Sequence, residues 1–235
     1  MALMSMEGWL FLLRWIHFLA GITWIGLLYY FNFVQTPFFA ETDPPVRSGA
    51  VQKLVPRALW WFRWSAMITF LAGWLIYLHK LGPAGWSNFF STSYGWTITL
   101  GGVLGTMMWA NVWFVIWPNQ KVVIANAVQT AQGGQAIPDA AARGRRAALA
   151  SRTNVVFSIP MLFYMAAASH FTLGVPASGA AMAWIWVVII AALEINALVG
   201  SKGAAKKPLD TVSGALWSGF VLSAIFYLLF ELLKK

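Results

Sequence analysis

The stretch GWLFLLRWIHFLAGITWIGLLYYFNFVQ, residues 8–35, decides the fold class of this protein. Its only charged residue is Arg14. A helix needs about 20 mostly apolar residues to cross the hydrocarbon core of a bilayer, and this stretch is long enough. Its backbone groups would have no partner in lipid outside a helix. We therefore predict a membrane-spanning helix here.

The composition of the whole chain agrees with this prediction. Of its 235 residues, 60% are hydrophobic and only 10% are charged, whereas soluble domains carry about 25% charged residues. So few charges cannot cover a surface that faces water, so the surrounding solvent must be largely lipid. No segment alternates apolar and polar residues as a barrel strand would. The predicted class is an all-α, polytopic membrane helix bundle.

Further apolar runs of similar length follow along the chain. They are spread evenly from end to end, which predicts one transmembrane helical domain over residues 1–235. Pro44 and Pro45 are expected to break the first loop, and the long loop near 118–151 is expected to contain a short amphipathic helix. Gly101, Gly102 and Gly105 would let the third helix pack closely. The six helices are expected near 8–35, 59–80, 95–117, 153–174, 180–200 and 212–233.

The basic residues predict how the bundle is oriented. Of the 16 Lys and Arg residues, twelve lie in or beside the odd-numbered loops and four on the opposite side. Positive residues favour the cytoplasmic side, so both termini are predicted to face the periplasm of a bacterial inner membrane. The net charge of +9 then reflects topology and contact with lipid headgroups. No aromatic–basic motif indicates nucleic acid as a partner.

All three histidines are predicted to lie toward the outer leaflet. His17 and His170 lie within the first and fourth predicted helices, while His79 lies at the end of the second. Imidazoles from two helices can hold the iron of a b-type haem. Arg14, one turn from His17, could pair with a haem propionate, and Gly21 would give a flat ring room. The alternative is that these histidines form hydrogen bonds between helices, and this alternative is favoured for His79.

A second polar set is predicted toward the cytoplasmic side. Bundles bind ligands where polar groups of facing helices converge, and such a set could hold a planar, amide-rich or anionic substrate. The alternative is structural, because Asn and Ser also join helices and Glu could pair with an Arg. The candidate substrate-binding residues are Asn32, Arg63, Asn111, Asn154 and Glu194.

The residue content also excludes several chemistries. The chain has no cysteine, which excludes disulfides, thiolate-held iron–sulfur clusters and a c-type haem attached through C-x-x-C-H. No nucleophile–base pair, phosphate-binding loop or metalloprotease motif is visible. The residues alone therefore leave the catalytic residues unassigned.

Four segments together resemble the membrane domain of the bacterial urate hydroxylase family, also called the urate oxidase N-terminal domain. The resemblance covers the first four predicted helices, about two-thirds of the chain. One departure is Arg152 and Thr153, which stand where the family pattern has a histidine. The segments are RWIHFLAGITWIG (14–26), WFRWSA (61–66), ANVWFVIWPNQ (110–120) and NVVFSIPMLFYMAAASH (154–170).

The resemblance implies oxidation of urate to 5-hydroxyisourate, with electrons passed to the respiratory chain. It aligns His17 and His170 with the two histidines of the family's helix motifs. Family members typically carry a C-terminal cytochrome c, and the missing C-x-x-C-H implies a separate periplasmic cytochrome c as acceptor. The other positions that match the family pattern are Asn111, Pro118, Asn119, Gln120, Asn154 and Pro160.

Three functions are compatible with the sequence. The leading one is a membrane-embedded, haem-binding oxidoreductase or electron-transfer protein that resembles urate hydroxylase. The alternative is a non-catalytic accessory subunit of a larger respiratory or photosynthetic membrane complex. A small-molecule transporter would predict broken helices and an inverted repeat, and neither is evident.

Overall fold

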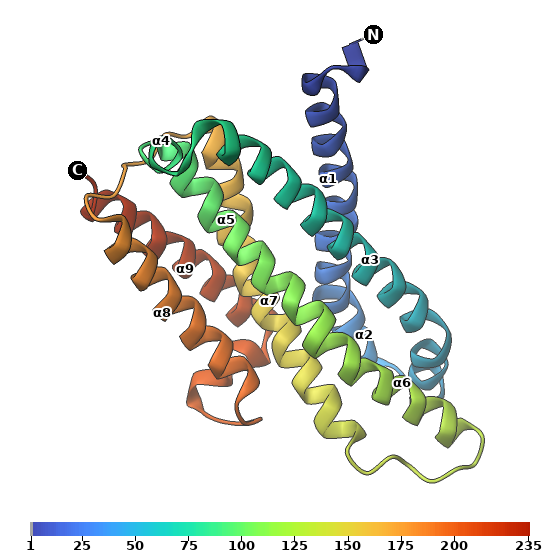
Figure 1. Ribbon diagram of the computed structural model, residues 1–235. Coiled ribbons are helices and arrows are strands. Elements are labelled where there is room, and N and C mark those ends of the chain that lie inside the picture. The colour runs from blue at the N-terminus through green and yellow to red at the C-terminus, as the bar shows by residue number, and fades with distance from the viewer. Residues whose placement is uncertain (1) are drawn as a thin grey trace.

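The computed structural model of the protein describes residues 2–235 and confirms the all-α class, with no β-strand among those residues. Long helices cross one another in a bundle, and both ends of the chain lie toward the upper end of Figure 1. The elements in chain order are η1 (Ala2–Met4), α1 (Met6–Tyr29), η2 (Tyr30–Gln35), α2 (Thr36–Glu41), α3 (Pro44–Ala84), α4 (Trp86–Phe90), α5 (Ser93–Ala110), η3 (Asn111–Ile116), α6 (Trp117–Ala131), α7 (Ala140–His170), α8 (Gly179–Leu198), η4 (Ala204–Asp210) and α9 (Val212–Leu232).

Four of the long helices begin at a hydroxyl side chain that the sequence places there. The hydroxyl accepts a hydrogen bond from the backbone N–H three residues later, which satisfies one of the free donors of the first turn. The bond is 3.1 Å long from Gly8 to Ser5. The other capping residues are Thr92, Ser178 and Thr211, which start α5, α8 and α9.

Helix α3, which contains the second predicted span, is much longer than the apolar run that predicted it. Pro44 and Pro45 do not break a loop; they occupy the first turn of α3, which continues for 41 residues to Ala84. Proline is tolerated there because its missing N–H would have no helical partner anyway. The expectation of a helix starting near residue 59 therefore missed fifteen residues of amphipathic extension.

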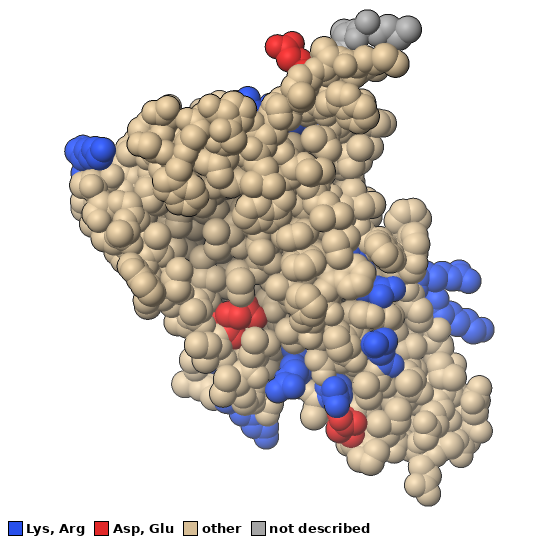
Figure 2. Space-filling model, in the orientation of Figure 1, with Lys and Arg blue, Asp and Glu red and all other residues tan. Residues whose placement is uncertain are grey.

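The segment 118–151 also differs from expectation, because it holds no separate short helix. Instead α6 continues from α5 through η3 as far as Ala131, and α7 begins at Ala140. Each of these helices thus extends beyond its apolar run into the basic end of the molecule. Figure 2 shows Lys and Arg side chains gathered at this lower end and few at the upper end.

Helix α7 is the centre of the bundle and packs against α5, α6, α8 and α9. Small residues let its neighbours approach. A Cβ on Gly101 of α5 would lie 2.7 Å from Met165, and one on Gly219 of α9 would lie 2.9 Å from the Val156 carbonyl oxygen. The expected role of Gly101 is thus confirmed, whereas Gly102 faces open space.

Within residues 2–235, four helical stretches are long and apolar enough to cross a membrane. Of the remaining two predicted spans, 59–80 lies inside α3, and 153–174 overlaps α7 and runs four residues past its end at His170. Residues 152–158 of helix α7 are all buried, and a helix segment enclosed by protein needs no apolar stripe on every side. The four stretches are Met6–Glu41, Ser93–Ala131, Gly179–Leu198 and Val212–Leu232.

Candidate functional site

His17 packs against α3 in a defined orientation. Its Nδ1 lies 2.9 Å from the Thr69 carbonyl oxygen, and a Cβ on Gly73 would lie 2.9 Å from its Cε1. An N–H on Nδ1 donates to that carbonyl, so Nε2 carries the lone pair. Histidines that ligate metals are commonly held this way, with the other ring nitrogen donating to a backbone carbonyl. The glycine that makes room for the imidazole is therefore Gly73; Gly21 instead faces Thr69.

The structure does not bring His170 into contact with His17. His170 ends α7 and is exposed, with no hydrogen bond to any described residue. Arg14 is also exposed and lies within electrostatic range of the Tyr94 hydroxyl on α5. Ser93 beside it accepts a 2.8 Å hydrogen bond from the Leu173 N–H.

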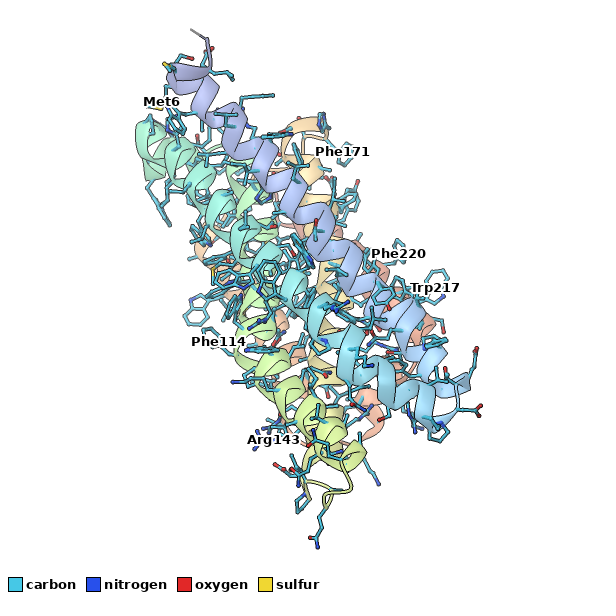
Figure 3. The ribbon with its side chains drawn as sticks, turned by 90° about the vertical axis from the view of Figure 1, so that its right-hand side faces the viewer. Met6, Phe114, Arg143, Phe171, Trp217 and Phe220 are labelled. Carbon is cyan, nitrogen blue, oxygen red and sulfur yellow. The ribbon has the colours of Figure 1, made fainter. Side chains whose placement is uncertain are left out.

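The N-terminus of α5 thus lies near Arg14 on one side and near the chain that follows His170 on the other. In Figure 3, Phe171, the residue after His170, lies toward the same end of the molecule as Met6, and Arg143 lies at the opposite end. The two histidine-bearing helix segments therefore share one end of the bundle.

The five candidate substrate residues separate into three places. Asn111, Asn154 and Glu194 form one closed network in the core. The Asn111 amide donates to Asn154 Oδ1 at 2.9 Å and to Glu194 Oε2 at 3.0 Å. The Asn154 amide donates to the Met108 carbonyl at 3.0 Å. The cluster is buried and does not line the cavity described below, so its geometry is that of interhelical hydrogen bonding.

Asn32 belongs to a second cluster near the basic end. Its amide donates to the Leu28 carbonyl and to Ser151 Oγ, both at 2.8 Å. Its Oδ1 accepts a 2.8 Å hydrogen bond from Arg152 Nε. This cluster lines a cavity of about 210 Å³ between η2, α3, α7 and η4.

Arg63 stands apart from both clusters. Its guanidinium lies over the Trp117 ring at 3.5 Å from the centroid, with Trp113 at 5.6 Å. Its Nε donates to the Leu59 carbonyl at 3.4 Å. A cation over an indole face is a stabilising contact in its own right, so Arg63 joins α3 to α6 and does not line the cavity.

Both clusters include a short π-helical segment inside a long helix. The segment η2 carries Asn32 and Gln35, and η3 begins at Asn111. Such segments are rare and often occur at functional sites, because the widened turn changes the direction of its side chains. Apart from the polar residues themselves, no sequence pattern predicts these two segments.

Arg152 is the residue that the sequence reading missed. The basic-residue pattern places it with the cytoplasmic loop charges, but it is buried, with 8% of its surface exposed, two residues before Asn154 in α7. Its position at the start of the apolar run, with only Thr153 between it and Asn154, was the available signal. Whether it faced lipid, water or Asn32 depended on how α1 packs against α7.

Comparison with known proteins adds a family assignment. No curated protein and no solved structure matches the chain. The family described as urate oxidase N-terminal matches residues 83–227. That range includes Asn111, Arg152, Asn154, His170 and Glu194; the segments bearing Arg14, His17, Asn32 and Arg63 precede it. Because the match covers more than half of the chain, this protein belongs to the urate oxidase N-terminal family.

Proposed function

We propose that this protein is a membrane-embedded, haem-binding oxidoreductase of the urate hydroxylase kind that passes electrons to a separate periplasmic cytochrome c. Urate and water yield 5-hydroxyisourate, two protons and two electrons, so the reaction requires an electron acceptor. The observation that carries the haem proposal is the orientation of His17. Its Nδ1 is held by the Thr69 carbonyl, which leaves Nε2 available to iron.

The residues at the upper end suit a b-type haem. His17 would supply one axial ligand, and His170, which is exposed at the same end of the bundle, is the proposed second ligand. Arg14 is exposed at the same end and suits a propionate carboxylate, since guanidinium groups bind carboxylates well. A bound haem would supply one-electron transfer at its iron.

The charge distribution supports the proposed topology. Lys and Arg gather at the end of the molecule opposite the termini (Figures 1 and 2). By the positive-inside rule that end faces the cytoplasm. We propose six spans in the bacterial inner membrane, the four apolar stretches plus α3 and α7, with both termini periplasmic. The histidine-bearing end would then face a periplasmic cytochrome.

An absorption spectrum of the purified protein tests this proposal. We expect a Soret band that His17→Ala and His170→Ala abolish. His79→Ala is the matched control and should keep the band, because His79 lies on α3 away from the Thr69–Gly73 contact. Gly73→Ala should weaken the band, since its Cβ would displace the His17 ring.

Turnover is measured on the same samples, as urate-dependent reduction of added cytochrome c. Folded protein that lacks pigment when made with haem available would overturn the haem proposal. A pigmented protein that never oxidises urate, and that co-purifies in fixed ratio with other subunits, would favour the accessory-subunit alternative instead.

A further inference from the structure

A cavity of about 210 Å³ lies at the basic end of the bundle, several times the roughly 30 Å³ that one water molecule takes in the liquid. One wall is apolar and includes Phe31, Leu59 and Phe62. The other is polar and comes from η2, α6, α7 and η4. Exposed Thr36 and Asp210 are among its lining residues, so the cavity reaches the surface. The polar lining residues are Asn32, Gln35, Thr36, Gln120, Arg145, Ser151, Arg152 and Asp210.

Arg152 enters this cavity with unused donors. Its Nε is bonded to Asn32 Oδ1, but Nη1 is fully enclosed and has no hydrogen-bond partner within residues 2–235. With only 8% of the residue exposed, water reaches little of the guanidinium. A buried guanidinium with unpaired donors carries a desolvation cost, so this arrangement favours an anion.

The surrounding side chains offset that charge only in part. Among the described residues that line the cavity, the one acid is Asp210, which interacts electrostatically with Arg152. Its Oδ1 is ion-paired with Arg145 Nη2 at 2.6 Å, so one acid faces two guanidinium groups. Arg152 forms no ion pair with any residue that the structure describes. The cavity therefore holds one excess positive charge, which a monoanion would balance.

The other groups narrow the chemistry of that anion. The side-chain oxygen Oε1 of Gln35 is buried and has no donor among the described residues. Gln35 lines the cavity, so a rotation of its amide lets Oε1 accept an N–H from a ligand. Phe31 and Phe62 lie edge to face with centroids 5.4 Å apart on the apolar wall, which suits a flat ring. A planar monoanion that presents both acceptor oxygens and a ring N–H satisfies all three features.

We propose that this cavity is an anion-binding site, in which Arg152 binds the oxygens of a planar heterocyclic monoanion and Gln35 accepts its N–H. The anion site itself follows from the unpaired guanidinium. Identifying its ligand with the substrate rests on the proposed function.

Binding to the detergent-purified full chain, followed by calorimetry, tests the site with three probes. Urate is a planar monoanion with ring N–H groups, benzoate is a planar anion without them, and uracil is planar and neutral. We expect urate to bind more tightly than benzoate and uracil to bind weakest. Hydrogen bonds to a charged group contribute about 1.5–3 kcal/mol, so Arg152→Gln should weaken urate at least tenfold.

Two further variants separate the contribution of Gln35 from that of the Arg152 charge. Gln35→Leu should weaken urate and leave benzoate unchanged, which also tests the site if Arg152→Gln fails to fold. Arg146→Gln removes the same charge from an exposed position on the same helix and should bind all probes as the natural protein does. Equal urate affinity in Arg152→Gln, or uracil binding as tight as urate, would overturn the proposal.

The absorption spectrum and urate turnover are recorded on the same samples, so that the two proposals can fail separately. Pigment-free protein that binds urate through Arg152 would sink only the redox proposal. Pigmented, active protein whose urate affinity is the same with and without Arg152 would overturn only the anion-site proposal.

Discussion

Two buried polar clusters in this bundle look alike in sequence and differ in their hydrogen bonding. In the Asn111–Asn154–Glu194 cluster, both amides donate to protein acceptors. In the Asn32–Arg152 cluster, Nη1 of Arg152 and the side-chain oxygen of nearby Gln35 have no hydrogen-bond partner among the described residues, and both side chains line a cavity. Satisfied groups stabilise helix packing, whereas unsatisfied ones are costly unless a ligand completes them.

This difference indicates how polar residues at membrane depth divide between structure and function. Residue type does not separate them, because each cluster contains an asparagine and a group that can carry charge. What separates the two clusters is the number of polar groups that have no hydrogen-bond partner in the protein. The following predictions test that distinction.

The largest expected effect is a loss of stability in Asn111→Leu. The change leaves acceptors on Asn154 and Glu194 without their donor in a buried site, at a total cost of about 2 kcal/mol. The melting temperature in detergent should fall by about 4–8 °C, and urate binding should be unchanged. A loss of urate binding in folded Asn111→Leu would contradict the assignment of this cluster to packing.

Arg152→Met should show the opposite pattern. Its own stability should change by about 1 kcal/mol at most, because losing the hydrogen bond to Asn32 is offset by removing a buried guanidinium with an unpaired donor. The natural protein should gain about 1.4 kcal/mol from urate at ten times Kd, and the variant should gain none. Thermal melting with and without urate measures both quantities, with Arg146→Met as the matched control.

Glu194→Gln should have a smaller effect. The glutamine oxygen can still accept the hydrogen bond from Asn111, and no cation pairs with Glu194 among the described residues. Melting should change by less than about 1 kcal/mol. A fall as large as that of Asn111→Leu would mean that the carboxylate charge itself is needed.

The smallest expected effect is at Asp139, outside the membrane-spanning stretches. A hydrogen bond from Arg143 holds the pKa of Asp139 below its ordinary value of 3.8. A lowered folded-state pKa contributes stability above that ordinary value and loses it as the pH falls through the folded value. The pair is exposed, so Asp139→Asn should barely shift melting at pH 7. Below the folded pKa even that difference should vanish, as melting at low pH would show.

The sequence alone determined that the helices suit lipid rather than water, and it determined much of the local structure. Apolar runs too long and too poor in charge for water required lipid and hence helices, and hydroxyl residues marked where four helices begin. The burial of Arg152 and the start of α3 could not be predicted in this way. The apolar pattern ended near residue 59, but the helix continued through polar positions to Pro44.

Only the tertiary structure decided which polar groups meet. Asn32 and Arg152 are 120 positions apart and are joined only because α1, which continues into η2, packs against α7. A hydrogen bond requires partners within about 3 Å, and spacing along one helix fixes only which face a residue shares. For that reason the sequence placed Asn32 and Asn111 in one set, while the packing of helices separated a completed network from an open cavity.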